Sequence, residues 1–493
     1  MNNKVTEYLM MIDDVINKGR YKDSWESLQA YPVPKWYRNA KFGIFIHFGV
    51  YSVPAFNNEW YPRDMYVQGT EVYEHHLKTY GTHKDFGYVD FIPMFKAEHF
   101  NAEEWMELIK SSGAKYVMPV AEHHDGFQMY DSELSDWNAV KMGPKRDILG
   151  ELKASAEKEG IVFCASSHRA ENYWYFGGAR HFDSGIQNIV YQEPYGYAHP
   201  DYSNEEAMFA LSNDIYSTPA SKEHLEDWLV RTCELVDKYK PKIVYFDWWI
   251  QNLSFKPYLK KFAAYYYNQA LEWGEEVTIN YKFDTFAFST AVFDVERGQL
   301  KNIRPTLWQT DSAVAKNSWG YTDANDYKNP VDIVCDIIDI VSKNGCMLLN
   351  IGPKSDGTIP QADRDILLSI GKWLDVNGES IYNTTFWKTF GEGPTEVKEG
   401  SFTDIERSHF TSEDIRFTYN TPYLYANVLS WPKNGEVTIK SLGYKAFNGD
   451  IKNIQVLGFD VPVKYTRDKE ALFIKVKSER NTEYPVCFKI RID

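Results

Sequence analysis

Polar side chains able to do chemistry recur directly after short apolar runs of this sequence. Most of these positions carry a histidine, a carboxylate or a tryptophan. In chain order they are His47, Glu59-Trp60-Tyr61, Glu122-His123-His124-Asp125, Ser166-Ser167-His168-Arg169, Asp247-Trp248-Trp249, Asn280, Lys282, Asp294, Glu296, Gln309, Asp311 and Asn350. If the runs are parallel barrel strands, their ends meet at one face and these side chains form a ring.

Such a ring suits the hydrolysis of glycosidic bonds. One carboxylate can attack or stabilise the anomeric carbon while a second carboxyl group protonates the leaving oxygen. Aromatic rings pack on the C–H faces of sugars, and His, Asn and Arg side chains hydrogen-bond sugar hydroxyls. The residue types therefore favour a sugar-binding hydrolytic site.

Each residue also has a structural interpretation. A histidine after a strand is often only a hydrogen-bonded structural residue, Asp247 could cap a helix, and Glu296 could pair with Arg297. Glu59 could be a solvated loop charge. The joint placement of these residues after successive runs is what favours a functional site.

No cofactor or metal is expected. His123 and His124 are adjacent, and the sequence has no His-Glu-x-x-His motif. The five cysteines are scattered without Cys-x-x-Cys spacing, which indicates neither a zinc site nor a disulfide framework. The chain also has no Gly-x-Ser-x-Gly elbow and no Gly-rich phosphate loop.

The elements that would position these residues are strands alternating with helices. Apolar, β-branched or aromatic runs predict strands. They cover 42–48, 115–121, 160–165, 242–246, 276–280, 306–308 and 346–350. Helical patterns at 102–112, 147–158 and 225–239 lie between them. This alternation predicts an α/β fold with a (β/α) barrel. The rival is a doubly wound sheet, but no Gly-x-Gly-x-x-Gly follows a strand.

The hydrophobic pattern of the sequence changes after about residue 380, where helical periodicity gives way to short alternating runs. Short alternating runs at 415–419, 423–429, 436–439 and 471–476 are separated by turn residues. They predict a C-terminal antiparallel β-sandwich domain. We expect a barrel domain over 1–378 and a sandwich domain over 379–493, with the boundary carried by 376–400.

Composition excludes several classes of protein. Of 493 residues, 43% are hydrophobic and 16% aromatic, which excludes a disordered chain. A net charge of −15 argues against nucleic acid or an anionic membrane surface as partner. The sequence shows no long apolar span and no signal peptide, so a cytoplasmic location is expected as given, and a secreted or periplasmic one if a leader was removed. A homo-oligomer remains open.

Seven ordered motifs resemble the α-L-fucosidases of glycoside hydrolase family 29. They are Lys41-Phe-Gly-Ile-Phe-Ile-His-Phe-Gly-Val-Tyr-Ser-Val-Pro54, Asn58-Glu-Trp-Tyr61, Glu122-His-His-Asp-Gly126, Ser135-Asp-Trp-Asn138, Gly143-Pro-Lys-Arg-Asp147, Ser318-Trp-Gly-Tyr321 and Leu349-Asn-Ile-Gly-Pro353. The resemblance covers roughly residues 35–380 and is weaker in the C-terminal part.

The resemblance implies a retaining exo-hydrolase that removes terminal α-L-fucose from a fucosylated oligosaccharide or glycoconjugate through a covalent fucosyl-enzyme. Its nucleophile falls on Asp247. The residues implied to contact fucose are His47, Glu59, Trp60, His123, His124 and His168. Trp319 is implied to wall the pocket near the sugar methyl.

Two positions depart from the family pattern. Many relatives carry Trp-Glu, with the Glu as acid/base, where this chain has Trp308-Gln309, and a neutral Gln cannot protonate a leaving group. Glu296, in the loop expected between 276–280 and 306–308, is therefore the predicted acid/base, with Glu59 as competitor. Lys282 stands near where relatives often supply an Arg to the sugar, so that contact stays open.

Two other functions stay open at this point. One is a related exo-glycosidase that accepts a galactose-like sugar. The other is a non-hydrolytic carbohydrate-binding protein on a degenerate fucosidase scaffold, with Gln309 as the record of a lost acid.

Overall fold

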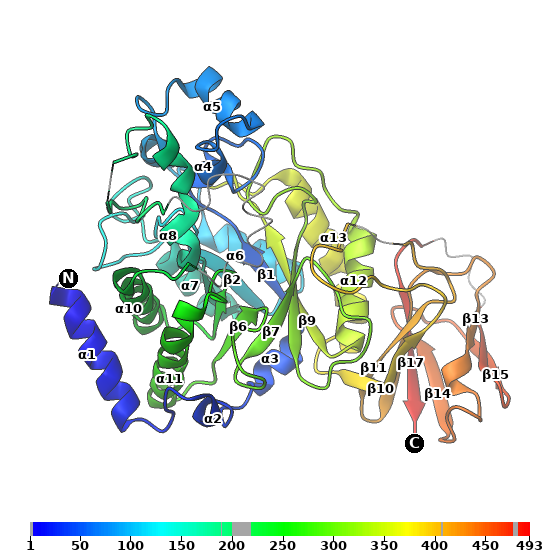
Figure 1. Ribbon diagram of the computed structural model, residues 1–493. Helices are drawn as coiled ribbons and strands as arrows, with labels where there is room; N and C mark the ends of the chain where they lie inside the picture. Colours follow the sequence, from blue (N-terminus) through cyan, green and yellow to red (C-terminus); the bar gives the residue numbers. More distant parts are fainter. Residues whose placement is uncertain (1–2, 189, 200–217, 406–407, 477–481) are drawn as a thin grey trace.

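A closed parallel sheet forms the N-terminal part of the computed structural model, which describes residues 3–188, 190–199, 218–405, 408–476 and 482–493 (Figure 1). Its strands are β1 (Phe42–Ile46), β2 (Tyr116–Glu122), β3 (Val162–Phe163), β4 (Ala165–Ser167), β5 (Ile243–Phe246), β6 (Thr278–Lys282), β7 (Val292–Glu296), β8 (Trp308–Ala313) and β9 (Gly345–Ile351). Each pairs in parallel with its neighbours, and β1 pairs with both β2 and β9, which closes the sheet.

The predicted (β/α) barrel is confirmed. Both β3 and β4 pair with β2 and are separated only by Cys164, so they act as one interrupted strand and the described residues form an eight-stranded barrel. Successive residues of a strand face opposite sides of the sheet. Thus Phe45 packs with interior residues such as Tyr245, while Ile44 and Ile46 pack outward among the helices.

Helices cover the outside of the barrel. The described helices are α1 (Asn3–Lys18), α2 (Trp25–Leu28), α3 (Lys35–Ala40), α4 (Tyr61–Asp64), α5 (Glu71–Tyr80), α6 (Ala102–Ser111), α7 (Ile148–Glu159), α8 (Asn172–Tyr175), α10 (Lys222–Tyr239), α11 (Lys256–Trp273), α12 (Pro330–Ser342) and α13 (Gln361–Asn377). The predicted helices at 102–112, 147–158 and 225–239 correspond to α6, α7 and α10. None of the described helices is long and apolar enough to span a bilayer.

The sequence-based placement of Glu296 in a loop was wrong. Glu296 is the last residue of β7, a strand that the apolar runs did not reveal. In Val292-Phe-Asp-Val-Glu296, Asp294 and Glu296 occupy alternate positions and point to the same side, the interior of the barrel. Because the inward face of this strand is acidic, the run lacks the hydrophobicity expected of a buried strand.

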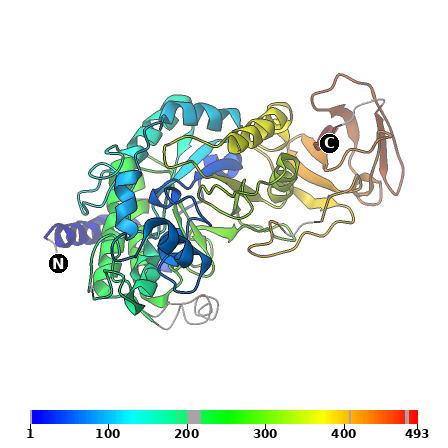
Figure 2. The ribbon, with the colours of Figure 1, turned by 90° about the horizontal axis from the view of Figure 1, so that it is seen from above.

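The C-terminal part forms the predicted antiparallel sandwich, which lies beside α12 and α13 at the end of the molecule opposite α1 (Figure 2). A five-stranded sheet contains β10 (Thr385–Glu392), β11 (Ile415–Asn420), β12 (Tyr423–Val428), β17 (Val486–Ile492) and β14 (Ile451–Val456). A three-stranded sheet contains β13 (Glu436–Ile439), β16 (Leu472–Val476) and β15 (Val463–Arg467). Phe417, Ile490 and Ile474 share one core between them. The division at 378/379 stays a prediction.

Candidate active site

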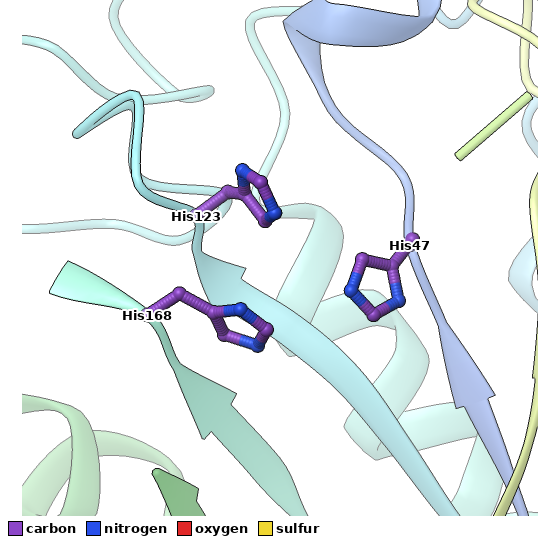
Figure 3. Close-up of side chains that lie close together, drawn as sticks. All are labelled: His47, His123 and His168. Atoms are coloured by element: carbon purple, nitrogen blue, oxygen red, sulfur yellow. The ribbon is translucent and has the colours of Figure 1, made fainter. Parts of the chain in front are cut away.

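Histidines and an aspartate meet at the carboxyl ends of the barrel strands. His47 follows β1, His123 follows β2, His168 follows β4 and Asp247 follows β5, and all four are buried. Figure 3 shows the imidazole rings of His47, His123 and His168 facing one another from neighbouring strands. The structure thus brings together side chains that are as much as 200 residues apart in the sequence.

Asp247 is held by three nitrogen groups. Its Oδ2 lies 3.2 Å from Nε2 of His124 and 3.3 Å from Nδ1 of His168. Its Oδ1 lies 2.8 Å from Nζ of Lys282. Burial alone would raise the pKa of Asp247, but Lys282 and the two histidines lower it well below the usual value. Asp247 is therefore ionised at neutral pH.

Lys282, the last residue of β6, joins this carboxylate to Glu296. Its Nζ is 2.7 Å from Oε2 of Glu296 and 3.6 Å from Oδ2 of Asp311. The ammonium is itself buried, but the pKa of Lys282 is raised well above normal because Asp247, Asp311 and Glu296 outweigh the effect of burial. Lys282 thus remains a cation between two carboxyl groups.

Glu296 differs from Asp247 in its protonation. Burial raises the pKa of Glu296 to about 7 against the opposing effect of Lys282, and the charge of Asp247 adds to the rise. The Glu296 side chain keeps 16% exposure, whereas that of Asp311 on the paired strand keeps 1%. Glu296 is therefore a carboxyl group that can carry a proton near neutral pH and can be reached from the mouth of the barrel.

His124 links Asp247 to a second buried acid, Glu171. The Nδ1 of His124 lies 3.1 Å from Oε2 of Glu171 and 3.0 Å from the backbone oxygen of His168. Burial disfavours the charged imidazole, but Glu171 and Asp247 together raise the pKa of His124. The sequence-based search did not single out Glu171. Its position could have indicated a site residue, because Glu171 lies four residues after the end of β4 in Ser167-His168-Arg169-Ala-Glu171.

The remaining histidines, His47 and His123, present polar ring atoms beside this cluster. The Nδ1 of His47 lies 2.6 Å from Oδ1 of Asn350, which fixes the orientation of the ring. Among the described residues the Nδ1 of buried His123 has no hydrogen-bond partner. Burial keeps the pKa of both His47 and His123 well below normal, so each is neutral and offers one donor and one acceptor. Such atoms suit hydroxyl groups of a ligand.

Two tryptophans flank these histidines. Trp60 contacts the His124 ring at 5.4 Å between centroids, and Trp319 contacts the His47 ring at 5.3 Å. Glu59 fixes the loop that carries Trp319. One of its oxygens accepts hydrogen bonds from the Ser318 hydroxyl at 3.0 Å and from the backbone N–H of Trp319 at 2.8 Å. The catalytic and sugar-contacting residues implied by the resemblance therefore lie in one region, whereas Asn280, Asp294 and Gln309 of the predicted ring contact one another or Tyr37 deeper in the barrel.

Gln309 lies in a different layer of the barrel. Its Oε1 accepts a hydrogen bond of 2.6 Å from the hydroxyl of Tyr37, and its Nε2 donates one of 2.8 Å to Asp294. Tyr37 belongs to α3, which directly precedes β1. These contacts therefore lie toward the N-terminal ends of the barrel strands. Gln309 is fully buried there, away from the strand ends that carry Asp247 and Glu296.

Two sets of ligand atoms in the site have the spacing of a metal site. The nitrogen or oxygen atoms of His47, His123 and His168 lie within 4.8 Å of one another, and so do those of His124, His168 and Asp247. His168 belongs to both sets. Its Nε2 also lies 2.7 Å from the Ser166 hydroxyl and its Nδ1 faces Asp247, so both of its ring nitrogens already have neighbours.

The chain matches two family models. The model described as Alpha-L-fucosidase covers residues 8–379, and the model described as Alpha-L-fucosidase C-terminal domain covers residues 408–492. The chain is 30% identical over 463 residues to the alpha-L-fucosidase of Branchiostoma floridae, which covers 90% of this chain and 89% of that protein. It is 28% identical to the tissue alpha-L-fucosidase of Homo sapiens, with 95% and 90% covered.

Solved structures of alpha-fucosidase also match the chain. The crystal structure of Thermotoga maritima alpha-fucosidase superimposes with a TM-score of 0.72 at 28% identity, covering 96% of this chain and all of that one. The same Thermotoga maritima protein in complex with fucose gives a TM-score of 0.71 at 28% identity, with 95% and 100% covered.

Proposed function

The chain belongs to the α-L-fucosidase family of glycoside hydrolases, and on this premise we propose that it is a retaining exo-α-L-fucosidase. Its substrates are fucosylated glycans that present a terminal α-L-fucose. In this proposal Asp247 is the nucleophile and Glu296 is the acid/base. His47, Trp60, His123, His124 and His168 contact the sugar, Trp319 lies near the sugar methyl, and Glu59 supports that wall.

In the first step Asp247 attacks the anomeric carbon of the bound fucose. Its low pKa keeps it ionised, so it is ready to form the ester bond. As the bond to the glycan breaks, the leaving oxygen takes the proton of Glu296. The raised pKa of Glu296 is what keeps this proton in place near neutral pH. The products of this step are the shortened glycan and a fucosyl-Asp247 ester.

In the second step Glu296, now a carboxylate, takes a proton from water. The water attacks the anomeric carbon from the face that the leaving group vacated, and the ester bond to Asp247 breaks. Esterification removes the negative charge of Asp247, so Lys282 is then paired with Glu296 and Asp311 alone. Two inversions give fucose of the original α configuration, and the enzyme regains its starting protonation.

The position of Lys282 is the observation that carries this proposal. The Nζ is 2.8 Å from Oδ1 of Asp247 and 2.7 Å from Oε2 of Glu296, so the two oxygens are separated by no more than the sum of these distances. That bound agrees with the ~5–5.5 Å of retaining enzymes and falls short of the ~6.5–9.5 Å of inverting ones. Glu59 is less suited to the acid/base role because one of its oxygens is engaged by the Trp319 loop.

Proton NMR during the first minutes of hydrolysis tests the stereochemical claim. With an aryl α-L-fucoside, the anomeric signal of α-L-fucose should appear first, and the β anomer should follow only as mutarotation proceeds. Initial appearance of β-L-fucose would mean an inverting mechanism and would remove the covalent intermediate.

Two alternatives are separated by simple assays. Turnover of the aryl α-L-fucoside excludes a purely carbohydrate-binding protein. Comparison with the aryl α-L-galactoside, which differs only by a hydroxyl on the C5 substituent, identifies a preference for a galactose-like sugar. The ligand spacing of the histidines favours a third alternative, a metal-dependent hydrolase. We propose instead that the histidines bind sugar hydroxyls, so activity should survive dialysis against EDTA. Loss of activity that zinc restores would favour the metal.

A further inference from the structure

A segment beyond the barrel, Gly400 to Asp404, packs against the turn that follows β7. We call it the strap segment. The backbone N–H of Phe402 donates a hydrogen bond of 2.9 Å to the backbone oxygen of Glu296. The N–H groups of Thr403 and Asp404 donate to the oxygen of Arg297 at 2.8 and 3.0 Å. A chain segment more than 100 residues downstream thus holds the backbone of the proposed acid/base residue.

Arg297 connects the strap segment to the loop that carries Trp319. Its guanidinium donates hydrogen bonds to the backbone oxygens of Ala315 and Lys316 at 3.0 and 2.9 Å. It also lies over the ring of Trp319, with 5.2 Å between the guanidinium carbon and the ring centroid. The same side chain therefore supports both the turn after Glu296 and the loop of Trp319.

The backbone of Arg297 needs such support. Its φ is +44°, in the left-handed region that non-glycine residues seldom adopt. Strained residues of this kind persist only where surrounding contacts fix them, and they concentrate at functional sites. The backbone N–H of Arg297 donates to the oxygen of Asp311 at 2.8 Å, and its backbone oxygen accepts the hydrogen bonds from Thr403 and Asp404 of the strap segment.

Asp404 supplies the charge that the turn requires. Its carboxylate lies 3.2 Å from Nε of Arg297, accepts a hydrogen bond of 2.8 Å from Ser312 at the end of β8, and pairs with Lys328. The side chains of Arg297 and Lys328 are almost completely buried, each with an exposure of 8%. Without Asp404, two buried cations at this turn would lose their shared counter-ion.

Gly298 makes the close approach of the strap segment sterically feasible. A Cβ at this position would lie 1.8 Å from the backbone oxygen of Gly400, which no side chain could tolerate. Gln299, the next residue, forms a β-bridge with Gly400. The turn after β7 is therefore shaped to receive this particular segment.

We infer that Asp404 is a positioning residue for the acid/base: through Arg297, the strap segment sets the place of the Glu296 carboxyl group and of Trp319. The inference rests on the proposed function of Glu296. It makes a segment outside the barrel part of the hydrolytic machinery, although it does not contact the sugar.

The test uses leaving groups that differ in their need for protonation. For a series from dinitrophenyl to phenyl α-L-fucoside, Asp404→Asn should reduce kcat/KM for the phenyl substrate by about 10- to 100-fold, the scale of a small misplacement of a catalytic group. The dinitrophenyl substrate needs little acid assistance, so its kcat/KM should change by less than about threefold. Gly298→Ala displaces the strap segment without altering a charge and should give the same pattern.

Two reference variants make the result unambiguous. Arg416→Met removes an ion pair between β11 and Asp339 of α12, so it weakens the domain contact without touching the turn. It should leave the leaving-group dependence unchanged. Glu296→Ala should show the steepest dependence of all, and failure of this variant to do so would contradict the proposed function rather than the positioning role.

Equal effects of Asp404→Asn on all leaving groups, or no effect, would overturn the inference if Glu296→Ala retains its steep dependence. Gly298→Ala decides the question in the same way if Asp404→Asn does not fold, because its Cβ disturbs the strap segment and retains the Asp404 carboxylate. Melting temperatures of all four variants separate a loss of folded enzyme from a loss of acid catalysis.

Discussion

We propose that Asp247, Lys282 and Glu296 carry the chemistry, and Lys282 pairs with both carboxyl groups. Lys282 and the neighbouring histidines lower the pKa of Asp247, whereas burial and the charge of Asp247 raise that of Glu296. Two carboxyl groups with opposite pKa shifts at this spacing are the pattern of an acid and a nucleophile. We therefore propose different roles for two residues that both carry a carboxyl group.

Azide distinguishes these roles. In Glu296→Ala the fucosyl-enzyme has no base to activate water, and turnover of a substrate with a poor leaving group should fall by about 10²–10⁴-fold. Azide needs no base, so it should accelerate turnover of an activated aryl fucoside and yield α-L-fucosyl azide. Asp247→Ala with azide should give the β-azide by a single inversion.

Glu59→Ala is the matched comparison for this prediction. Glu59 holds the Trp319 loop, so its loss should weaken substrate binding but show no azide rescue. If Glu59→Ala gave the α-azide and Glu296→Ala did not, the two glutamates would exchange roles.

Lys282 should control the pH range of activity. Activity needs Asp247 ionised and Glu296 protonated, so kcat/KM of the wild type should decline as pH rises through about 7, where Glu296 loses its proton. The ammonium of Lys282 lowers the pKa of both carboxyl groups, and Lys282→Met should therefore move both limbs of the pH profile to higher pH.

Lys282→Arg keeps the positive charge and provides the control. It should preserve the positions of both limbs more closely than Lys282→Met does. A Met variant whose limbs stay in place, or move to lower pH, would show that Lys282 does not set the protonation of the pair.

At the scale of elements, alternation along the strands explains both what the sequence revealed and what it concealed. The hydrophobic runs that became β1, β2, β5 and β9 are apolar on both faces, since one face packs inside the barrel and the other against helices. Strand β7 was not predicted because Asp294 and Glu296 occupy inward positions, so the run is not apolar on both faces. The residues after β1, β2, β4 and β5 were found because strand ends converge in a barrel.

Contacts that span the sequence could not be predicted. The link from His124 to Glu171 depends on the turn after β4, and the link from Glu296 to Phe402 depends on how the sandwich follows the barrel. No local pattern specifies either contact. The division at 378/379 and the roles of the site residues likewise remain predictions.

Strand register also gives a testable explanation for Gln309. On β8 the side chain at 309 faces Tyr37 and Asp294 at the N-terminal end of the barrel. Gln309→Glu should therefore not restore acid catalysis to Glu296→Ala. It should place a second carboxylate against Asp294 and lower the free energy of unfolding by about 1–3 kcal/mol.

Denaturant titration and the aryl fucoside assay measure both effects. Gln309→Met is the control, since it removes the hydrogen bonds without adding charge. Recovery of phenyl fucoside hydrolysis in the Gln309→Glu, Glu296→Ala double variant would mean that position 309 reaches the sugar.

At the scale of the whole molecule, the barrel and the sandwich are joined by buried polar contacts. Arg416 of β11 pairs with Asp339 of α12 at 2.5 Å, the hydroxyl of Thr418 donates to the backbone oxygen of Ser380 at 2.6 Å, and the indole of Trp373 donates to the backbone oxygen of Pro485 at 2.9 Å. Loose inter-domain contacts are the ordinary expectation in proteins, and these buried bonds oppose such motion.

Calorimetry should accordingly show one unfolding transition for both parts of the chain. Arg416→Met should lower the midpoint of this transition, because breaking a buried ion pair costs about 3–5 kcal/mol. The remaining ion pair between Lys343 and Asp339 should reduce this loss. Two well-separated transitions in the wild type would contradict this coupling.

We propose that Asp247 forms a covalent bond to the anomeric carbon. A 2-deoxy-2-fluoro-fucosyl fluoride tests it directly, because fluorine at C2 slows both steps while the fluoride leaving group permits the first. We expect an intact mass increased by one fluorofucosyl residue and a digest that places the label on Asp247. An unlabelled protein that still hydrolyses the aryl fucoside, or a label on another carboxyl group, would contradict it.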